Sequence, residues 1–187
     1  GAKPLFYAGK LFYSMGKMEE AIKYFDLELS QNPDSALTLY YKGKASEFLG
    51  LGSADCFSRA YELDPTHPCG IAGMAIIMVY AKEKPEDAIK LLNTADTSNG
   101  WRDEVAEARV LAYVALSDFK SALPSAKILV EERPADANAW YIYAICLEAM
   151  RDFEGGIDTA EKGLRIDPAD PACNFVKVSC TSKLGRT

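Results

Sequence analysis

Apolar residues recur at three- and four-residue spacing along almost the whole chain, which is the period of an amphipathic α-helix. The pattern predicts helices over residues 3–15, 18–31, 35–49, 52–63, 68–82, 85–95, 102–116, 119–132, 136–149, 152–166 and 171–184. The breaks between these segments are short and carry Gly, Pro, Asn or Asp, as turns do. No segment alternates in the way a half-buried strand would, so the sequence predicts an all-α protein.

Prolines mark several helix boundaries. Pro85 and Pro171 are predicted in a first helical turn, where a missing N–H removes no hydrogen bond. Pro124 lies inside the segment 119–132, which predicts either a kink or a late start of that helix.

Four other prolines recur at nearly even intervals. Pro33, Pro65, Pro134 and Pro168 are separated by 32, 69 and 34 residues, and the middle interval is about twice the last. A fixed period of this size is typical of stacked helical hairpins. Segments 9–33 and 144–168 align without a gap over 25 residues.

Small residues recur where the paired helices are expected to face each other. Gly9 aligns with Ala144, and Ala21 aligns with Gly156. Antiparallel helices approach closely only where the facing positions lack bulk, so these positions are predicted contact points within each hairpin.

The pattern resembles the tetratricopeptide repeat (TPR), a unit of 34 residues with W-x2-L-G-x2-Y, then A-x3-F, then P. The fifth repeat shows the match through Trp140, Ala144, Leu147, Phe153, Gly156, Ala160 and Pro168, and the first through Leu5, Ala8, Gly9, Phe12, Gly16, Ala21, Phe25 and Pro33. The second repeat carries Gly43, Leu49, Gly50, Ala54, Phe57, Ala60 and Pro65. The fourth departs at Val110, where a small residue is expected, and the third matches least.

This resemblance implies a right-handed α-solenoid formed by a single array over residues 1–187. Its five repeats would cover about 2–33, 34–66, 67–100, 101–134 and 135–168. A terminal helix, 169–187, would cap the array by shielding its neighbour with Phe175, Val178 and Leu184.

Composition excludes several classes of function. The net charge of −6 argues against a nucleic-acid-binding protein, which needs a basic surface. The most apolar stretch, 71–81, is shorter than the roughly 20 residues of a membrane span, so no membrane insertion is expected. Five cysteines without a CxxC pair favour reduced thiols and a cytoplasmic location over a disulfide framework.

Residues for catalysis or ligand coordination are sparse. His67 is the only histidine, and its proximity to Cys69 in a turn does not give the geometry of a catalytic pair. One histidine and scattered cysteines do not form a metal ligand set, and no glycine-rich phosphate loop follows a strand. The sequence therefore predicts no enzymatic activity, no cofactor and no metal, and His67 is interpreted as a loop residue.

In proteins of the TPR family, the first helix of each repeat lines a concave groove that binds a peptide. The matching positions here are Phe6, Lys10, Tyr13, Tyr40, Lys44, Glu47, Ile76, Tyr80, Glu107, Leu111, Tyr141, Ile145 and Glu148. In the third repeat two registers stay open, Ala72, Ile76 and Val79 or Gly73, Ile77 and Tyr80. The alternative is that these groups pack against neighbouring repeats.

The charges along the predicted groove suggest a polarity for its ligand. Lysines lie in the first two repeats and glutamates in the last two, which favours a ligand that is acidic or aromatic at one end and basic at the other. The lysine–asparagine clamp that binds terminal carboxylates in this family is disfavoured, because the matching asparagines are absent.

The sequence thus predicts a non-enzymatic scaffold or adaptor that binds a protein segment in its groove. An alternative is the regulatory or substrate-selecting arm of a larger enzyme, since the chain opens without Met and can be part of a longer protein. A third hypothesis is self-association through an exposed end of the array.

Overall fold

The computed structural model describes residues 4–81 and 85–185, and over these residues it contains eleven helices and no strand. They are α1 (Pro4–Ser14), α2 (Met18–Gln31), α3 (Ala36–Phe48), α4 (Ala54–Leu63), α5 (Pro68–Tyr80), α6 (Pro85–Leu92), α7 (Arg102–Ala115), α8 (Phe119–Glu132), α9 (Ala137–Ala149), α10 (Phe153–Ile166) and α11 (Pro171–Lys183). The all-α prediction is confirmed. Within the described part of the chain, no helix is both long and apolar enough to span a bilayer.

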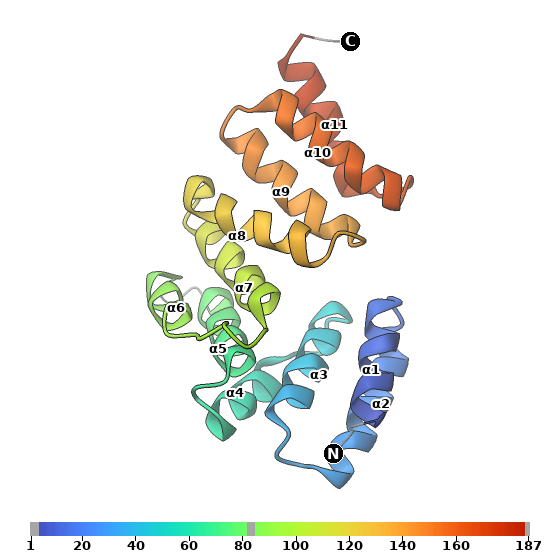
Figure 1. The fold of residues 1–187 in the computed structure, drawn as a ribbon, viewed down its shortest axis with the longest axis vertical. Helices are drawn as coiled ribbons and strands as arrows, with labels where there is room; N and C mark the ends of the chain where they lie inside the picture. The colour runs from blue at the N-terminus through green and yellow to red at the C-terminus, as the bar shows by residue number, and fades with distance from the viewer. Residues whose placement is uncertain (1–3, 82–84, 186–187) are drawn as a thin grey trace. The chain divides into compact units, whose positions relative to one another are not determined.

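The chain divides into two compact units, Gly1–Trp101 and Arg102–Thr187. In unit 1 the helices α1, α3 and α5 contact one another in a row, and α2, α4 and α6 pack against them (Figure 1). In unit 2 the helix α8 joins α7 to α9, and α9, α10 and α11 pack together. We call α1, α3, α5, α7, α9 and α11 the first helices, because each begins a predicted repeat.

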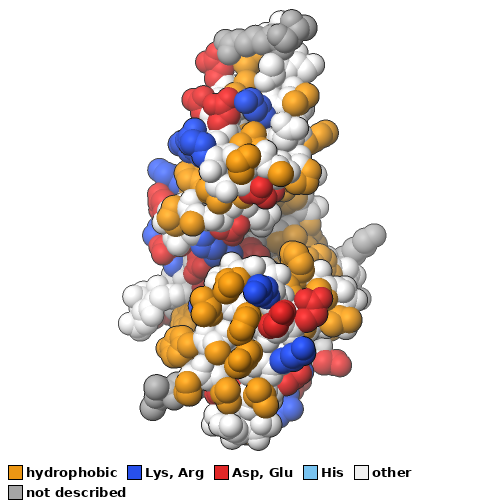
Figure 2. Space-filling model, turned by 90° about the vertical axis from the view of Figure 1, so that its right-hand side faces the viewer, with side chains coloured by type: hydrophobic (Ala, Val, Ile, Leu, Met, Phe, Trp, Pro, Cys, Tyr) orange, Lys and Arg blue, Asp and Glu red, His pale blue; other side chains and the backbone are white. Residues whose placement is uncertain are grey.

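Exposed apolar side chains gather on the outward side of unit 1 that carries α1 and α2 (Figure 2). Tyr7, Leu11 and Met15 follow one another at four-residue spacing and are each more than half exposed, as is Leu27 of α2. Residues four apart share a helix face, so the first three form one stripe. We call Tyr7, Leu11 and Met15 the α1 stripe.

The turns that follow five of the first helices contain a residue with left-handed backbone at a regular position. It is Gly16, Gly50 and Gly185 in three turns, with φ of 74°, 69° and 68°. In two others it is Ser117 and Arg151, with φ of 57° and 66°. Residues 16 and 50, 117 and 151, and 151 and 185 lie 34 positions apart, so the turn geometry repeats with the period that the prolines predict.

Aspartates cap the helices of unit 2. The carboxylates of Asp118, Asp136, Asp152 and Asp170 accept backbone N–H groups at the starts of α8, α9, α10 and α11, which satisfies donors that a helix leaves open. Pro85 and Pro171 begin their helices as predicted. Of the two alternatives predicted from Pro124, a kink or a late start, the late start is wrong, because Asp118 caps α8 and the helix begins at Phe119.

Two phenylalanines of unit 1 fill space that facing glycines leave open. A Cβ atom added to Gly9 would lie 2.5 Å from Cε1 of Phe25, and one added to Gly43 would lie 2.6 Å from Cε1 of Phe57. Gly73 of α5 faces Phe57 from the other side, with an added Cβ 2.8 Å from its Cδ1. Both rings are fully buried, so the small residues allow the first and second helices to close around them.

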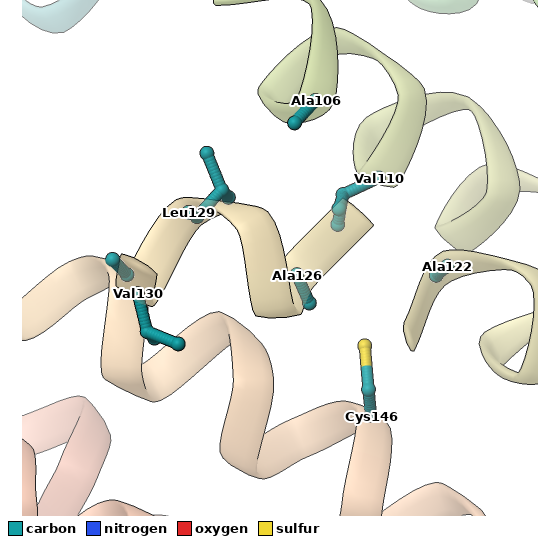
Figure 3. Close-up of a cluster of buried hydrophobic side chains, with 8 residues drawn as sticks. Ala106, Val110, Ala122, Ala126, Leu129, Val130 and Cys146 are labelled. Carbon is teal, nitrogen blue, oxygen red and sulfur yellow. The ribbon is translucent and has the colours of Figure 1, made fainter. Parts of the chain in front are cut away.

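The α7–α8 hairpin of unit 2 has the reverse assignment of sizes. Val110 occupies the position of Gly9 and Gly43, and the residue across from it is Ala126 in place of a phenylalanine; both lie in one buried cluster with Ala122 and Leu129 (Figure 3). The departure from the repeat motif at Val110 is therefore accommodated, since a larger group on α7 meets a smaller one on α8.

Three buried cysteines pack between helices of unit 2. An added Cβ on Gly156 would lie 2.9 Å from Sγ of Cys180, nearer than the 3.7 Å to the carbonyl oxygen of Ala144. The absence of a side chain at Gly156 therefore chiefly allows Cys180 of α11 to pack closely against it. The cysteine thiols are free, and burial raises the pKa of Cys146 to about 11, which keeps it an inert packing group.

Of the three side chains predicted to shield the neighbour of the terminal helix α11, Leu184 is half-buried, but Phe175 and Val178 are not used. The helix buries Cys173, Val176 and Cys180, whereas Phe175 and Val178 are well over half exposed. The prediction had the wrong helix face: the inward positions follow a three- and four-residue spacing from 173, and residues 175 and 178 fall between them.

Candidate binding surface

Three of the predicted groove residues lie in the core. Phe6, Tyr40 and Ile76 are 3%, 1% and 2% exposed, so the expectation that they line an open surface is wrong. The ring of Phe6 lies 5.7 Å from that of Tyr41, and the ring of Tyr40 lies 5.7 Å from that of Phe57. Large aromatic rings gain more from packing against such neighbours than from facing water.

Lys10 and Tyr13 stay at the surface of unit 1, where both meet one tyrosine of α3. The Lys10 ammonium lies 4.5 Å from the centre of the Tyr41 ring, in cation–π geometry. The ring of Tyr13 approaches the same tyrosine edge-on at 5.8 Å. Tyr41 therefore links α1 to α3 and sets the position of both predicted binding residues.

The remaining predicted residues of unit 1 differ in their contacts. Lys44 and Glu47 lie one helical turn apart on α3, and their charged atoms are 3.7 Å apart. Tyr80, at the end of α5, is 57% exposed. Of the two registers left open for α5, only the one containing Ile77 and Tyr80 reaches the surface, because Ala72, Ile76 and Val79 are all buried.

The two carboxylates predicted for unit 2 already hold partners within the unit. Glu107 accepts a hydrogen bond of 2.9 Å from Arg133, whose Nε also donates to Asp103 at 2.6 Å. Glu148 accepts bonds from Ser179 and from Lys183, at 2.5 and 2.7 Å. The acidic end of the predicted polarity is therefore neutralised internally.

These contacts change how the carboxyls titrate. Burial would raise the pKa of Asp103, but hydrogen bonding with Glu104 and the charge of Arg133 outweigh it and lower the pKa to about 2. For Glu148, burial is likewise opposed by Lys183 and Ser179, and the net pKa is lowered. Both groups are therefore ionised at neutral pH and held by cations.

The apolar residues predicted in unit 2 are half-buried. Tyr141 and Ile145 of α9 pack against the buried cluster of Ala144, Ala160, Val176 and Cys180. Leu111 of α7 is also half-exposed. Each of these side chains thus presents part of its apolar surface to solvent while its base is fixed by packing.

Two residues near Lys10 were missed from the sequence. Tyr41 directly follows Tyr40 and is buried like it, and the period of the helix alone did not show that Tyr41 would meet Lys10. Trp101 matches no position of the repeat motif, so no signal pointed to it. His67 was interpreted as a loop residue; it caps α5, with Nδ1 accepting the N–H of Cys69 at 3.1 Å.

No group of three or more His, Cys, Asp or Glu side chains able to hold a metal ion is found among residues 4–81 and 85–185.

Comparisons with known proteins agree with the helical arrangement. Models described as tetratricopeptide repeat match residues 3–35 and 107–171. No curated protein sequence matches the chain.

Several solved structures share the fold. A thermophilic TPR protein of Thermus thermophilus is 18% identical, over 96% of this chain and 98% of that one, with a TM-score of 0.72. PilW, a widely conserved type IV pilus biogenesis factor, is 11% identical over 98% and 86%, with a TM-score of 0.71. YrrB, a TPR protein with an unusual peptide-binding site, is 18% identical over 95% and 92%, with a TM-score of 0.57. At these identities the likeness shows a solenoid fold of helical hairpins.

Proposed function

Because the chain belongs to the tetratricopeptide repeat family, we propose that it is a non-enzymatic scaffold that holds a segment of a partner protein on its first helices. Proteins of this family are generally non-catalytic scaffolds for protein–protein interaction. One structural relative, YrrB, has a peptide-binding site, which supports a peptide as the ligand.

One observation carries this proposal: the predicted carboxylates of the first helices are paired, while aromatic and aliphatic groups beside them stay partly exposed. Glu47, Glu107 and Glu148 each lie within 3.7 Å of a cation in their own unit. Tyr13, Tyr141 and Ile145 are fixed at one side and solvated at the other. Fixed aromatic groups with a polar rim are typical anchors of a protein interface.

The ligand is a peptide selected from a displayed library. If it binds unit 1, Tyr13→Ala should weaken its binding about tenfold or more, and if it binds unit 2, Tyr141→Ala should do so. The reason is that a packed aromatic anchor carries a large share of the binding affinity. Isothermal titration calorimetry would measure the change. Tyr40 is unsuitable as a test position, since it belongs to the core.

The matched control is Tyr61→Ala, which removes a half-buried tyrosine from α4, a helix that is not one of the first helices. Its effect should stay within about twofold. Failure to select any peptide, or an equal loss on Tyr61→Ala, would place binding away from the first helices and refute the proposal.

Self-association is a second candidate, and the exposed apolar groups favour it. The α1 stripe lies on the first hairpin, and Phe175 and Val178 are exposed on the last helix. Each inner hairpin buries such groups against its neighbour, so a second copy of the chain, docked head to tail, would cover both surfaces.

Sedimentation velocity should then show a mass that rises with protein concentration. Leu11→Glu, which places a charge in the α1 stripe, should restore a single monomeric mass because the buried charge would lack a partner. The exposed residue Glu19 offers a control as Glu19→Gln. A constant monomeric mass for the parent chain over the whole concentration range would eliminate this candidate.

A further inference from the structure

Trp101 is the last residue of unit 1, and its backbone has a conformation that bulky residues rarely adopt. Its φ is 62°, in the left-handed region. Such strain persists only where surrounding contacts hold it, and it is concentrated at functional sites. The contacts of the indole ring therefore have to offset the strain of the backbone.

The ring of Trp101 meets residues from two parts of unit 1. The Lys10 ammonium of α1 lies 5.9 Å from its centre. The ring of His67, the cap of α5, lies 5.4 Å away with the two planes tilted by 51°. The same ammonium lies over Tyr41 of α3. We call Lys10, Tyr41 and His67 the Lys10 cluster. Lys10 and His67 contact the indole ring, and Lys10 connects that ring to Tyr41 of α3.

The charge of this cluster is not balanced by a carboxylate. Within the described residues, the Lys10 ammonium contacts two aromatic rings and forms no ion pair. His67 accepts a backbone N–H through Nδ1 and is therefore neutral; burial lowers its pKa more than Asp64 raises it. Lys10 is thus the cation of the cluster.

The segment around Trp101 does not supply the missing anion. Asp103, two residues further on, is held by Arg133 at 2.6 Å. Asp96, five residues earlier, accepts the N–H of Ser98. Trp101 therefore offers the cluster an aromatic ring without a carboxylate.

We propose that the Lys10 cluster is the anchor site for an aromatic side chain of a partner peptide that has a carboxylate beside it, and that Trp101 is its internal occupant when no peptide is bound. This proposal rests on the peptide-scaffold function proposed above. A Phe or Trp next to Asp or Glu supplies both the ring and the anion for Lys10. Displacement of Trp101 also releases its strained backbone. While Trp101 occupies the site, the peptide can bind only those molecules whose site is open. The apparent affinity for the peptide is therefore reduced by the fraction of open sites.

Trp101 fluorescence tests the displacement directly. The chain has two tryptophans, so Trp140→Phe leaves Trp101 as the only one. The probe is an acetylated and amidated peptide with one Phe flanked by Asp and Glu and no Trp. Its titration should shift the Trp101 emission to the red and increase quenching by acrylamide. The same peptide with Ala in place of Phe should leave the emission unchanged.

Two variants measure the competition in the Trp140→Phe background. Trp101→Asn removes the ring and places a residue that tolerates the left-handed backbone, so it should tighten peptide binding about fivefold or more. Lys10→Met keeps the apolar stem and removes the charge, so it should weaken binding about tenfold. Calorimetry gives the affinities, and circular dichroism checks that both variants are folded.

The outcomes separate this proposal from the general scaffold function. A bound peptide that leaves the Trp101 emission unchanged, or equal affinities for Trp101→Asn and its parent, would overturn the internal occupant. If the acidic Phe peptide bound neither the Trp140→Phe protein nor its Trp101→Asn derivative, the proposed class of ligand would be wrong. The library selection with Tyr13→Ala and Tyr141→Ala tests the scaffold function independently of both results.

Discussion

Phe57→Ala should lower the free energy of unfolding by about 3–5 kcal/mol, the range for deleting a fully buried phenylalanine. The ring is completely buried between Gly43 of α3 and Gly73 of α5. Neither glycine has a side chain that could move into the space left by the ring, so collapse of the cavity is restricted. Urea denaturation followed by circular dichroism would measure the loss.

The same substitution at Phe48 is the control, because that ring lies in the same unit and is 71% exposed. Its effect should stay within about 0.5 kcal/mol. If Phe57→Ala cost less than about 1 kcal/mol, the two glycines would not be closed around the ring, and the register of α3, α4 and α5 would be wrong.

Arg133→Ala should destabilise the protein by about 2–4 kcal/mol, because it leaves two partly buried carboxylates facing each other without their cation. Arg133 follows α8 and bonds to Asp103 and Glu107 of α7. About three quarters of each of these side chains is shielded from water, so solvent compensates the lost pairing only in part. Urea denaturation gives the change in free energy.

Arg102→Ala is the matched control. Arg102 is half exposed and lies 3.2 Å from Glu132, so its removal should cost no more than about 1 kcal/mol. Equal losses for the two arginines would show that the Arg133 pair is a surface interaction.

Acidification provides a second readout of the Arg133 cluster. The pKa of Asp103 is lower in the folded chain, at about 2, than its ordinary value near 3.9. The contribution of Asp103 to the free energy of unfolding is therefore complete above about pH 4 and is lost as the pH falls toward 2. Arg133→Ala should lose less stability than the parent over this interval, and an identical loss in both proteins would contradict the assignment.

The helices and their pairing could be predicted from the sequence because they depend on local signals. Apolar periodicity, prolines at first turns and the regular spacing of turns all act over a few residues. The compensation at Val110 could not be predicted, since it depends on Ala126, and the shape of a core position is set jointly by both helices. The choice of Phe175 and Val178 on α11 failed for a related reason, because both faces of this short helix carry apolar residues.

The candidate surface was predictable only in part. Lys10, Tyr13, Tyr80, Leu111, Tyr141 and Ile145 lie at the surface, as their repeat positions predict. Phe6, Tyr40 and Ile76 do not, because an aromatic or branched side chain at a boundary position turns inward when a neighbour such as Tyr41 or Phe57 offers contact. Trp101 lies outside the repeat motif, and only the fold brings it to Lys10.

The opposite pairing of sizes in the hairpins of unit 1 and in the α7–α8 hairpin limits how such a chain can change by exchange of segments. A crossover inside a hairpin would set Val110 opposite a phenylalanine, or Gly43 opposite an alanine. The first product would clash and the second would contain a void. A crossover in a loop that joins one hairpin to the next keeps the pairs within each hairpin intact. It would still separate Phe57 from Gly73 of the following hairpin, so the first helix of each hairpin must also suit the hairpin before it.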